Sequence, residues 1–399
     1  MLAATGWAQP LEPGDLVIAD RQGMGPARLL QVERATGRQH TLYVSYDGVL
    51  VAPRDVEIDA QGRIVASQSA TPLRPAPEGI VRFDPVNGAA TRLSEGGQLL
   101  AVDGIAVART GAIYAADHGD ATGTPPSIVR VDATTGAQSA VTSGGLLVRP
   151  VDVAVEPGGS LVVLDAGTGS GARLVRVDPA SGAQTLLVGA GPLGPAAGGV
   201  DVDVDGSIVV LDAFGGLFRV APATGAVTPL AVDAGVTSSD LALEPDGDAL
   251  VLAGSGADRI DRVDLATGAL RTLASGLVSP VGVAVVRPTA PFCDAEVEEP
   301  RYTNGQTLRV STLRLVNPLA AAFATRVRLR VAIPGNPTPV PLLDVPVTLP
   351  PRIDADLAPF ALLTVSAGLP RGDWELRCAF EDAETGTVRA SDVARFTLE

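Results

Sequence analysis

Aspartate recurs at two fixed positions of a pattern that returns along most of the chain. Each copy of the pattern contains two successive apolar segments. One aspartate position lies at the start of the first segment (the opening position), and the other lies at the end of the second segment (the closing position). Carboxylates converging from several copies could bind Ca²⁺, which takes oxygen ligands, or raise one another's pKa and supply a general base. The alternative is that each carboxylate caps its own turn by accepting backbone N–H groups. The closing residues are Asp20, Asp117, Asp165 and Asp212, and the opening residues are Asp55, Asp152 and Asp240.

The sequence identifies no definite cofactor; Asp165 and Asp212 are the metal-ligand candidates of this set, and Ca²⁺ is the ion that they could bind. The stretch 201–206, Asp-Val-Asp-Val-Asp-Gly, resembles the opening of a calcium loop. No carboxylate follows it at the spacing of a bidentate glutamate, and its last glycine aligns with the hairpin glycine of the other copies. We therefore interpret this stretch as an ordinary strand and turn.

Two adjacent copies have lengthened connections, at residues 69–79 and 118–127. Irregular insertions on one face are where repeat proteins often bind partners. His118 and Asp120 would be the polar residues of the second insertion, which makes them candidate ligand-binding residues. The alternative is a solvated loop without a binding role.

Several catalytic signatures are missing from the chain. It contains no P-loop, no Gly-x-Ser-x-Gly elbow, no His-Glu-x-x-His and no Cys-x-x-Cys. The sequence therefore gives no support for nucleophilic or zinc catalysis.

These candidates are positioned by a motif that occurs six times, at spacings of roughly 43 to 51 residues, as in propeller blades. Each copy reads as four short strands separated by glycine-containing turns, and the third strand has the form Arg-Val-Asp-x-x-x-Gly. Residues 14–44 supply strands two to four of one blade, and residues 281–286 supply its first strand. We predict an all-β protein whose residues 14–288 form a closed six-bladed β-propeller.

Segments such as GSLVVLD (159–165) and LVRVDPASG (174–182) resemble the NHL-type repeat of bacterial propellers, and the virginiamycin B lyase-like group in particular. The resemblance covers residues 14–288 and implies the propeller fold. Lyases of that group rely on a histidine pair near a bound cation. This chain has two histidines, His40 and His118, in different kinds of connection that are expected on opposite faces or at different radii.

The composition restricts the partners. The net charge is −15, and all 30 basic residues other than histidine are arginine. Nucleic acid requires a basic surface, so this acidic balance argues against it. The sequence also has no uncharged apolar run of about 18 residues, so we expect no membrane span.

Residues 1–13 are interpreted as the remnant of a signal peptide or as a disordered N-terminus, because a short apolar stretch ends in small residues before Gln9.

A composition change near residues 287–300 marks a boundary, and residues 296–399 contain alternating runs separated by proline and glycine. They predict an immunoglobulin-like β-sandwich with Trp374 in its core. Cys293 and Cys378 are the only cysteines. An even pair in a chain that looks exported favours a disulfide, with two free buried thiols as the alternative.

The function that these observations favour is a secreted, periplasmic or cell-surface protein without catalytic activity. Its propeller would bind a protein, a small molecule or a glycan, and its sandwich would act as a spacer or adhesion-type module. The alternative is a metal-assisted lyase or hydrolase acting at the acidic channel mouth of the propeller.

Overall fold

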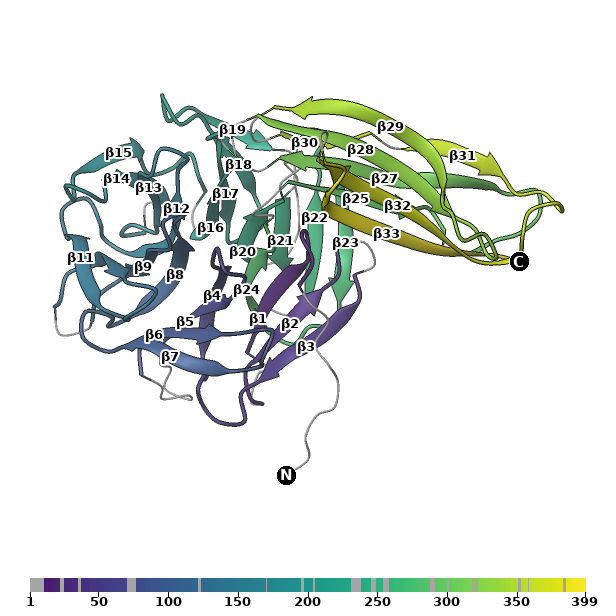
Figure 1. Cartoon of the computed structure of the whole chain (residues 1–399). Helices are drawn as coiled ribbons and strands as arrows, with labels where there is room; N and C mark the ends of the chain where they lie inside the picture. Colours follow the sequence, from purple (N-terminus) through teal and green to yellow (C-terminus); the bar gives the residue numbers. More distant parts are fainter. Residues whose placement is uncertain are drawn as a thin grey trace. The chain divides into compact units, whose positions relative to one another are not determined.

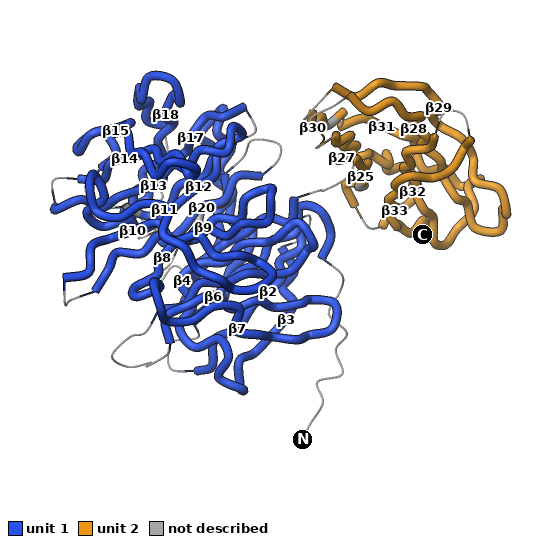
Figure 2. The backbone as a smooth tube through the Cα atoms, turned by 60° about the vertical axis from the view of Figure 1, so that its left-hand side comes forward, with its two compact units in different colours: residues 1–287 blue, residues 288–399 orange. Residues whose placement is uncertain are grey.

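The computed structural model describes residues 11–399 with internal gaps. The gaps are residues 22–24, 35–36, 70–76, 121–122, 170, 195–196, 204, 231–237, 245–248, 254–257, 288–290, 300, 318, 320–321, 351–352, 358 and 383–384. The chain divides into two compact units, Met1–Arg287 and Pro288–Glu399 (Figure 2). Every element of the described residues is a β-strand (Figure 1). No helix among them is long and apolar enough to span a bilayer.

The described residues of the first unit form six four-stranded antiparallel sheets, three of which contain the strands of residues 16–143. These three are β24 (Pro280–Val285), β1 (Leu16–Asp20), β2 (Arg28–Val32) and β3 (Gln39–Val44); β4 (Pro53–Ile58), β5 (Ile64–Gln68), β6 (Gly79–Phe83) and β7 (Ala90–Glu95); and β8 (Val102–Val107), β9 (Ile113–Asp117), β10 (Ser127–Val131) and β11 (Gln138–Ser143).

The next three sheets repeat the same strand order, in which each strand pairs with its neighbour in sequence. They are β12 (Pro150–Val155), β13 (Leu161–Asp165), β14 (Arg173–Val177) and β15 (Gln184–Val188); β16 (Ala197–Val202), β17 (Ile208–Asp212), β18 (Leu217–Val220) and β19 (Val227–Leu230); and β20 (Ser238–Leu243), β21 (Ala249–Ala253), β22 (Arg259–Val263) and β23 (Leu270–Ser275).

The first sheet joins the two ends of the unit. β24 pairs antiparallel with β1, with Leu16 opposite Val285 and Ile18 opposite Val283. This confirms that the last strand of the unit completes the sheet that the first three strands begin, so β1 has a partner on both sides.

The core of this unit lies between neighbouring sheets. Successive side chains of a strand point to opposite faces, so Val17 packs toward one neighbouring sheet and Ile18 toward the other. Both faces are covered, and β1, β5, β9, β13 and β17 are therefore buried along their whole length.

The hairpin between the third and fourth strands explains the recurring Asp-x-x-x-Gly. In the β14–β15 hairpin, Asp178 Oδ1 accepts the N–H of Ala180 at 2.9 Å, and Gly182 has φ of 72°, a conformation that glycine adopts without strain. The same combination ends the third strand of the other copies whose hairpins carry both residues.

The second unit consists of two sheets around one core that contains Trp374, which is 2% exposed as expected. One sheet contains β25 (Phe292–Val297), β27 (Thr307–Asn317), β30 (Ile353–Asp356) and β31 (Phe360–Thr364). The other contains β26 (Arg301–Tyr302), β33 (Val388–Leu398), β32 (Gly372–Glu381), β28 (Phe323–Ala332) and β29 (Val340–Leu349).

The second unit begins earlier than the sequence suggested. β25 starts at Phe292, inside the segment interpreted as the boundary, and it pairs with β27. Cys293 on β25 forms a disulfide with Cys378 on β32, with their Cα atoms 6.0 Å apart. The expected disulfide is confirmed, and it links the two sheets of this unit.

Candidate functional site

The closing aspartates end the second strands of their sheets and are buried. Asp165 Oδ2 accepts the N–H groups of Val148 and Arg149 at 2.7 and 3.0 Å, and its Oδ1 accepts that of Gly167 at 2.8 Å. Arg173 Nε also donates to Oδ1 at 3.0 Å. The carboxylate thus ties the connection that enters the first strand of the sheet to the end of the second strand.

The equivalent residues have related partners. Asp117 and Asp20 each accept two successive N–H groups of the incoming connection, and Gln68 occupies this position in the β4–β7 sheet. Asp212 accepts the N–H of Phe214 in its own turn. These bonds satisfy backbone donors at a point where the chain leaves regular structure.

The metal candidates Asp165 and Asp212 lie in adjacent sheets, each within its own turn. Among the residues that the structure describes, no group of three or more His, Cys, Asp or Glu side chains has an arrangement that could hold a metal ion. Binding of Ca²⁺ at Asp165 and Asp212 stays a prediction.

The opening aspartates do come together. Asp55, Asp152 and Asp240 are 8, 7 and 7% exposed, and each is the third residue of a first strand. We call them the axial carboxylates, because the six first strands contact one another in a ring. Their sheets alternate with the three sheets that carry Gly104, Gly199 and Gly282 at the same position.

Each axial carboxylate joins two sheets. One oxygen accepts the N–H of the next residue in its own strand, and the other accepts an N–H of the first strand in the next sheet. The bonds to the next sheet run from Ile105 to Asp55 at 2.8 Å, from Val200 to Asp152 at 2.7 Å and from Val283 to Asp240 at 2.8 Å.

Burial dominates the electrostatics of this ring. It raises the pKa of Asp55 to about 7, despite the bonds from Ile105 and Val56 that favour the charged form. Burial, followed by repulsion from Asp55, also raises the pKa values of Asp152 and Asp240 well above the ordinary range. The Asp240 side chain lowers the pKa of Asp55 in part, and the charge of Asp103 raises it further.

A second level of charge lies two residues further along the first strands. Burial, followed by the charges of Asp55 and Asp201, raises the pKa of Glu57 to about 8. Asp201 accepts the N–H of Leu243 at 2.9 Å and pairs with Arg287 at 3.0 Å. The calcium-loop resemblance of residues 201–206 thus corresponds to a carboxylate that joins sheets.

Near the start of the first strands, Asp103 lies between an arginine and a histidine. Arg54 Nε is 3.7 Å from Asp103 Oδ1, and His118 Nε2 is 3.7 Å from Asp103 Oδ2. His118 is one third exposed. This trio is the rim of the ring, on the side from which the lengthened connections emerge.

The remaining polar candidates lie elsewhere. His40 is on the outermost strand β3 and pairs with Glu33 at 2.7 Å, so the structure does not bring the two histidines together. Asp120 is exposed and accepts the N–H of Thr124 at 3.1 Å. Most of the insertion 69–79 lies outside the described residues. Ligand binding by His118 and Asp120 stays a prediction.

Arg54, Glu57 and Asp103 were not among the predicted site residues, and Asp201 was considered only as part of the calcium-loop-like stretch. They fall at the second and fifth positions of the first strands, where the other copies carry small or apolar residues. A comparison of the copies position by position would have found them, since an ionisable side chain at such a position interrupts the pattern.

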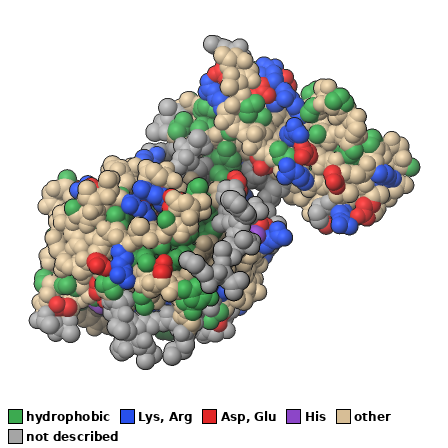
Figure 3. Space-filling model, turned by 60° about the horizontal axis from the view of Figure 1, so that its bottom comes forward, with side chains coloured by type: hydrophobic (Ala, Val, Ile, Leu, Met, Phe, Trp, Pro, Cys, Tyr) green, Lys and Arg blue, Asp and Glu red, His purple; other side chains and the backbone are tan. Residues whose placement is uncertain are grey.

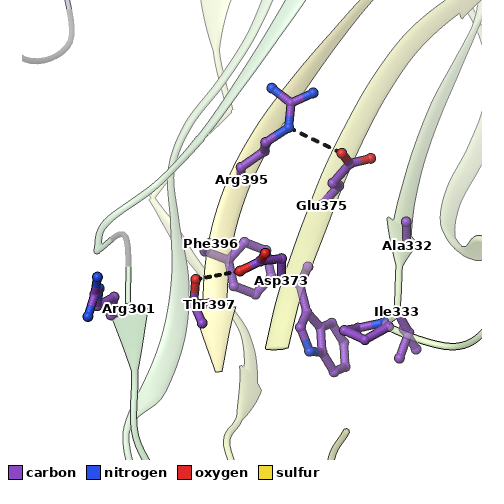
Figure 4. A pocket seen from close by; sticks show the side chains of 10 residues that line it. Arg301, Ala332, Ile333, Asp373, Glu375, Arg395, Phe396 and Thr397 are labelled. Atoms are coloured by element: carbon purple, nitrogen blue, oxygen red, sulfur yellow. Dashed lines mark hydrogen bonds and ion pairs between the residues drawn. The ribbon is translucent and has the colours of Figure 1, made fainter. Parts of the chain in front are cut away.

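The second unit has a separate cavity of about 590 Å³, lined in part by Ile333, Glu375, Arg395 and Phe396 (Figure 4). Its polar side chains have partners: Arg395 binds Glu375 at 3.2 Å, the Thr397 hydroxyl donates to Asp373 at 2.9 Å, and Arg301 pairs with Glu399 at 2.9 Å. These pairs leave few groups of the cavity wall to recognise a ligand.

No protein-family model and no curated protein matches the chain. Solved structures do match it. A chain of a nidogen–laminin complex has a TM-score of 0.55 at 16% identity, over 69% of this chain and 99% of that one. TolB from Acinetobacter baumannii has a TM-score of 0.54 at 15% identity, over 69% of this chain and 67% of that one.

Virginiamycin B lyase from Staphylococcus aureus also matches, with a TM-score of 0.47 at 14% identity, over 76% of this chain and 92% of that one. Sequence identities this low support similarity of the fold alone and say nothing about function. The four-stranded sheets and the first two of these neighbours together show that the chain contains a β-propeller.

Proposed function

We propose that this chain is an extracytoplasmic protein that binds a protein partner through one face of a six-bladed propeller. Its C-terminal unit, an immunoglobulin-like sandwich in this proposal, acts as a spacer. The observation that carries the proposal is the position of the exposed large apolar side chains on the propeller.

The relevant face follows from the topology. Successive strands of an antiparallel sheet run in opposite directions. The connection from the second to the third strand therefore lies at the same end of the strands as the connection from the fourth strand to the first strand of the next sheet. We call this side of the propeller the loop face, and it includes the connections 45–52, 144–149, 213–216 and 276–279. Its exposed large apolar residues are Tyr46 (86%), Phe214 (61%), Val278 (46%) and Val148 (37%).

Exposure of these apolar side chains to water is unfavourable in free energy, and burial against a partner would be favourable. Aromatic side chains and arginine are enriched at the centres of protein interfaces. The loop face combines Tyr46 and Phe214 with the exposed Arg149 and the rim residues Arg54 and His118. Exposed apolar side chains also lie among charged ones on the side of the molecule seen in Figure 3.

Two further observations support the proposal. The Cys293–Cys378 disulfide is typical of proteins that fold in an oxidising compartment outside the cytoplasm. A chain with the same fold forms part of a nidogen–laminin complex. The net charge of −15 favours a protein partner over nucleic acid.

A photoreactive benzoylphenylalanine tests the loop face. Placed at position 214, it should crosslink a protein of the extracellular fraction of the native organism. The matched control is position 86. Val86 is 94% exposed, and it lies in a hairpin between a third and a fourth strand, at the end of the strands opposite the loop face. The same yield at both positions, or no crosslink at either, would count against the proposal.

A further inference from the structure

The axial carboxylates and the glycines between them hold the six first strands together. Each carboxylate accepts an N–H from the next sheet, as described above, and each glycine allows the following sheet to approach. A Cβ atom on Gly104 would lie 2.1 Å from Asp152 Oδ1, and one on Gly282 would lie 2.7 Å from the Cα atom of Asp55. Each of these glycines is therefore packed against the axial carboxylate residue of a neighbouring sheet, where a side chain has no room.

Acidic groups dominate the charges that face these carboxylates. Glu57 on β4, Asp103 on β8 and Asp201 on β16 accompany them, whereas β24 contributes Gly282 and Ala284, which carry no charge. Arg54 pairs with Asp103, Arg287 pairs with Asp201, and His118 lies beside Asp103 at the rim. The described cations are thus engaged at the two ends of the ring and not with the axial carboxylates.

An ionised ring would hold three like charges in a poorly hydrated space. Burial of a charge without a counterion is costly, and a carboxyl group in such a place takes up a proton instead. The two backbone N–H groups that each carboxylate accepts act in the opposite sense, but burial outweighs them.

We propose that the axial carboxylates form a proton-dependent seam, which closes the six inner strands when it is protonated and loosens them when it ionises. The device is independent of the partner proposed for the loop face. Through it, the stability of the propeller responds to pH near neutrality.

The sign follows from proton linkage. The folded state binds these protons more tightly than the unfolded chain, in which aspartate titrates near 3.8. The extra stability is present in full below that value, and it is lost as the pH rises through the folded pKa values, about 7 for Asp55 and about 8 for Glu57. Hairpin aspartates such as Asp178, whose pKa is lowered by a bond from Ser181, act only at more acidic pH.

The first measurement is the melting temperature of the propeller in the intact chain, from about pH 5.5 to about pH 8.5, with a chelator present. We expect a fall of several degrees over this range, which persists when salt is added, because buried charges are screened less than surface charges. A flat or rising profile overturns the proposal. So does a fall that disappears with salt, because it would come from general surface repulsion.

A divalent cation is the competing way to neutralise the ring. If Ca²⁺ or Mg²⁺ restores the melting temperature at about pH 8.5 to its value at about pH 5.5, a metal ion replaces the proton and the proposal is wrong. If added cation leaves the profile unchanged, the proton explanation stands.

Variants locate the effect. The triple variant Asp55→Asn, Asp152→Asn and Asp240→Asn should lose most of the pH dependence, whereas the exposed control Asp178→Asn should keep it. Should the triple variant not fold, calorimetry of the wild-type chain in two buffers of different ionisation enthalpy gives the same answer. Unfolding at about pH 6 must then release roughly one proton or more, and release of none overturns the proposal.

Discussion

At the scale of single residues, the contacts of the ring predict a large effect for a very small change. In Gly104→Ala, the added Cβ would lie 2.1 Å from Asp152 Oδ1 and 2.6 Å from the Cα atom of Asp152. Backbone cannot move aside as a flexible side chain can, so we expect a loss of about 2 kcal/mol or more in the free energy of unfolding. Denaturant unfolding of the intact chain measures this loss.

Gly158 provides the control, because a Cβ atom there meets nothing within 4 Å and its φ is not in the left-handed region. Gly158→Ala should be neutral or slightly stabilising. Equal stabilities of the two variants would show that the ring tolerates a wider separation than its contacts indicate.

The residues that recur in this ring could be read from the sequence, but their contacts could not. Asp55, Asp152 and Asp240 could be aligned with glycines of the other copies, and the possibility that carboxylates raise one another's pKa followed from their convergence. Their bonds to the next sheet could not be predicted, because the partners Ile105, Val200 and Val283 contribute only backbone N–H groups. Periodicity says which residues share a position, and the ring geometry decides which atoms meet.

At the scale of elements, β29 is an edge strand whose prolines disfavour pairing with a strand of another chain. It carries Val340, Leu342 and Val345, which are 38, 43 and 36% exposed, and it pairs with β28 on one side in the described sheet. Pro341 and Pro346 lie opposite Arg330 and Arg326 in that pairing. A proline has no N–H, so it fits an edge strand where that position faces away from the ladder.

We therefore expect that Pro341→Thr and Pro346→Thr together allow edge-to-edge association. The new N–H groups would give a second chain a row of donors beside exposed apolar side chains. Light scattering at increasing concentration should show dimers or larger species. Pro337→Thr, in the exposed loop before β29, is the control and should stay at the wild-type size. If the double variant also keeps that size, the prolines do not protect the edge.

The strands differ in how well the sequence predicts them. Among the alternating runs of residues 296–399, the runs 340–349 and 388–398 can be read from the sequence alone, and they coincide with β29 and β33. β25 was missed, since its six residues, Phe292–Val297, include two acidic side chains next to a proline-rich segment. Pairing with β27 and the disulfide at Cys293 stabilise a strand that its own composition does not favour.

At the scale of the whole molecule, the two units have separate cores, and they should unfold separately. The buried cluster that includes Trp374 and both cysteines contains residues of the second unit alone. The clusters between the propeller sheets contain residues of the first unit alone. Calorimetry of the intact chain should therefore resolve two transitions.

Reduction of the disulfide should affect only one of these transitions. Cys293 and Cys378 are 85 residues apart, and a loop of that length contributes about 4 kcal/mol in the chain-entropy model. For a unit of this size, reduction should lower the melting temperature by on the order of 20 °C. The double variant Cys293→Ala and Cys378→Ala should melt at the lower temperature with or without reductant. If reduction lowers both transitions together, the units are coupled, and the second unit supports the propeller as well as extending it.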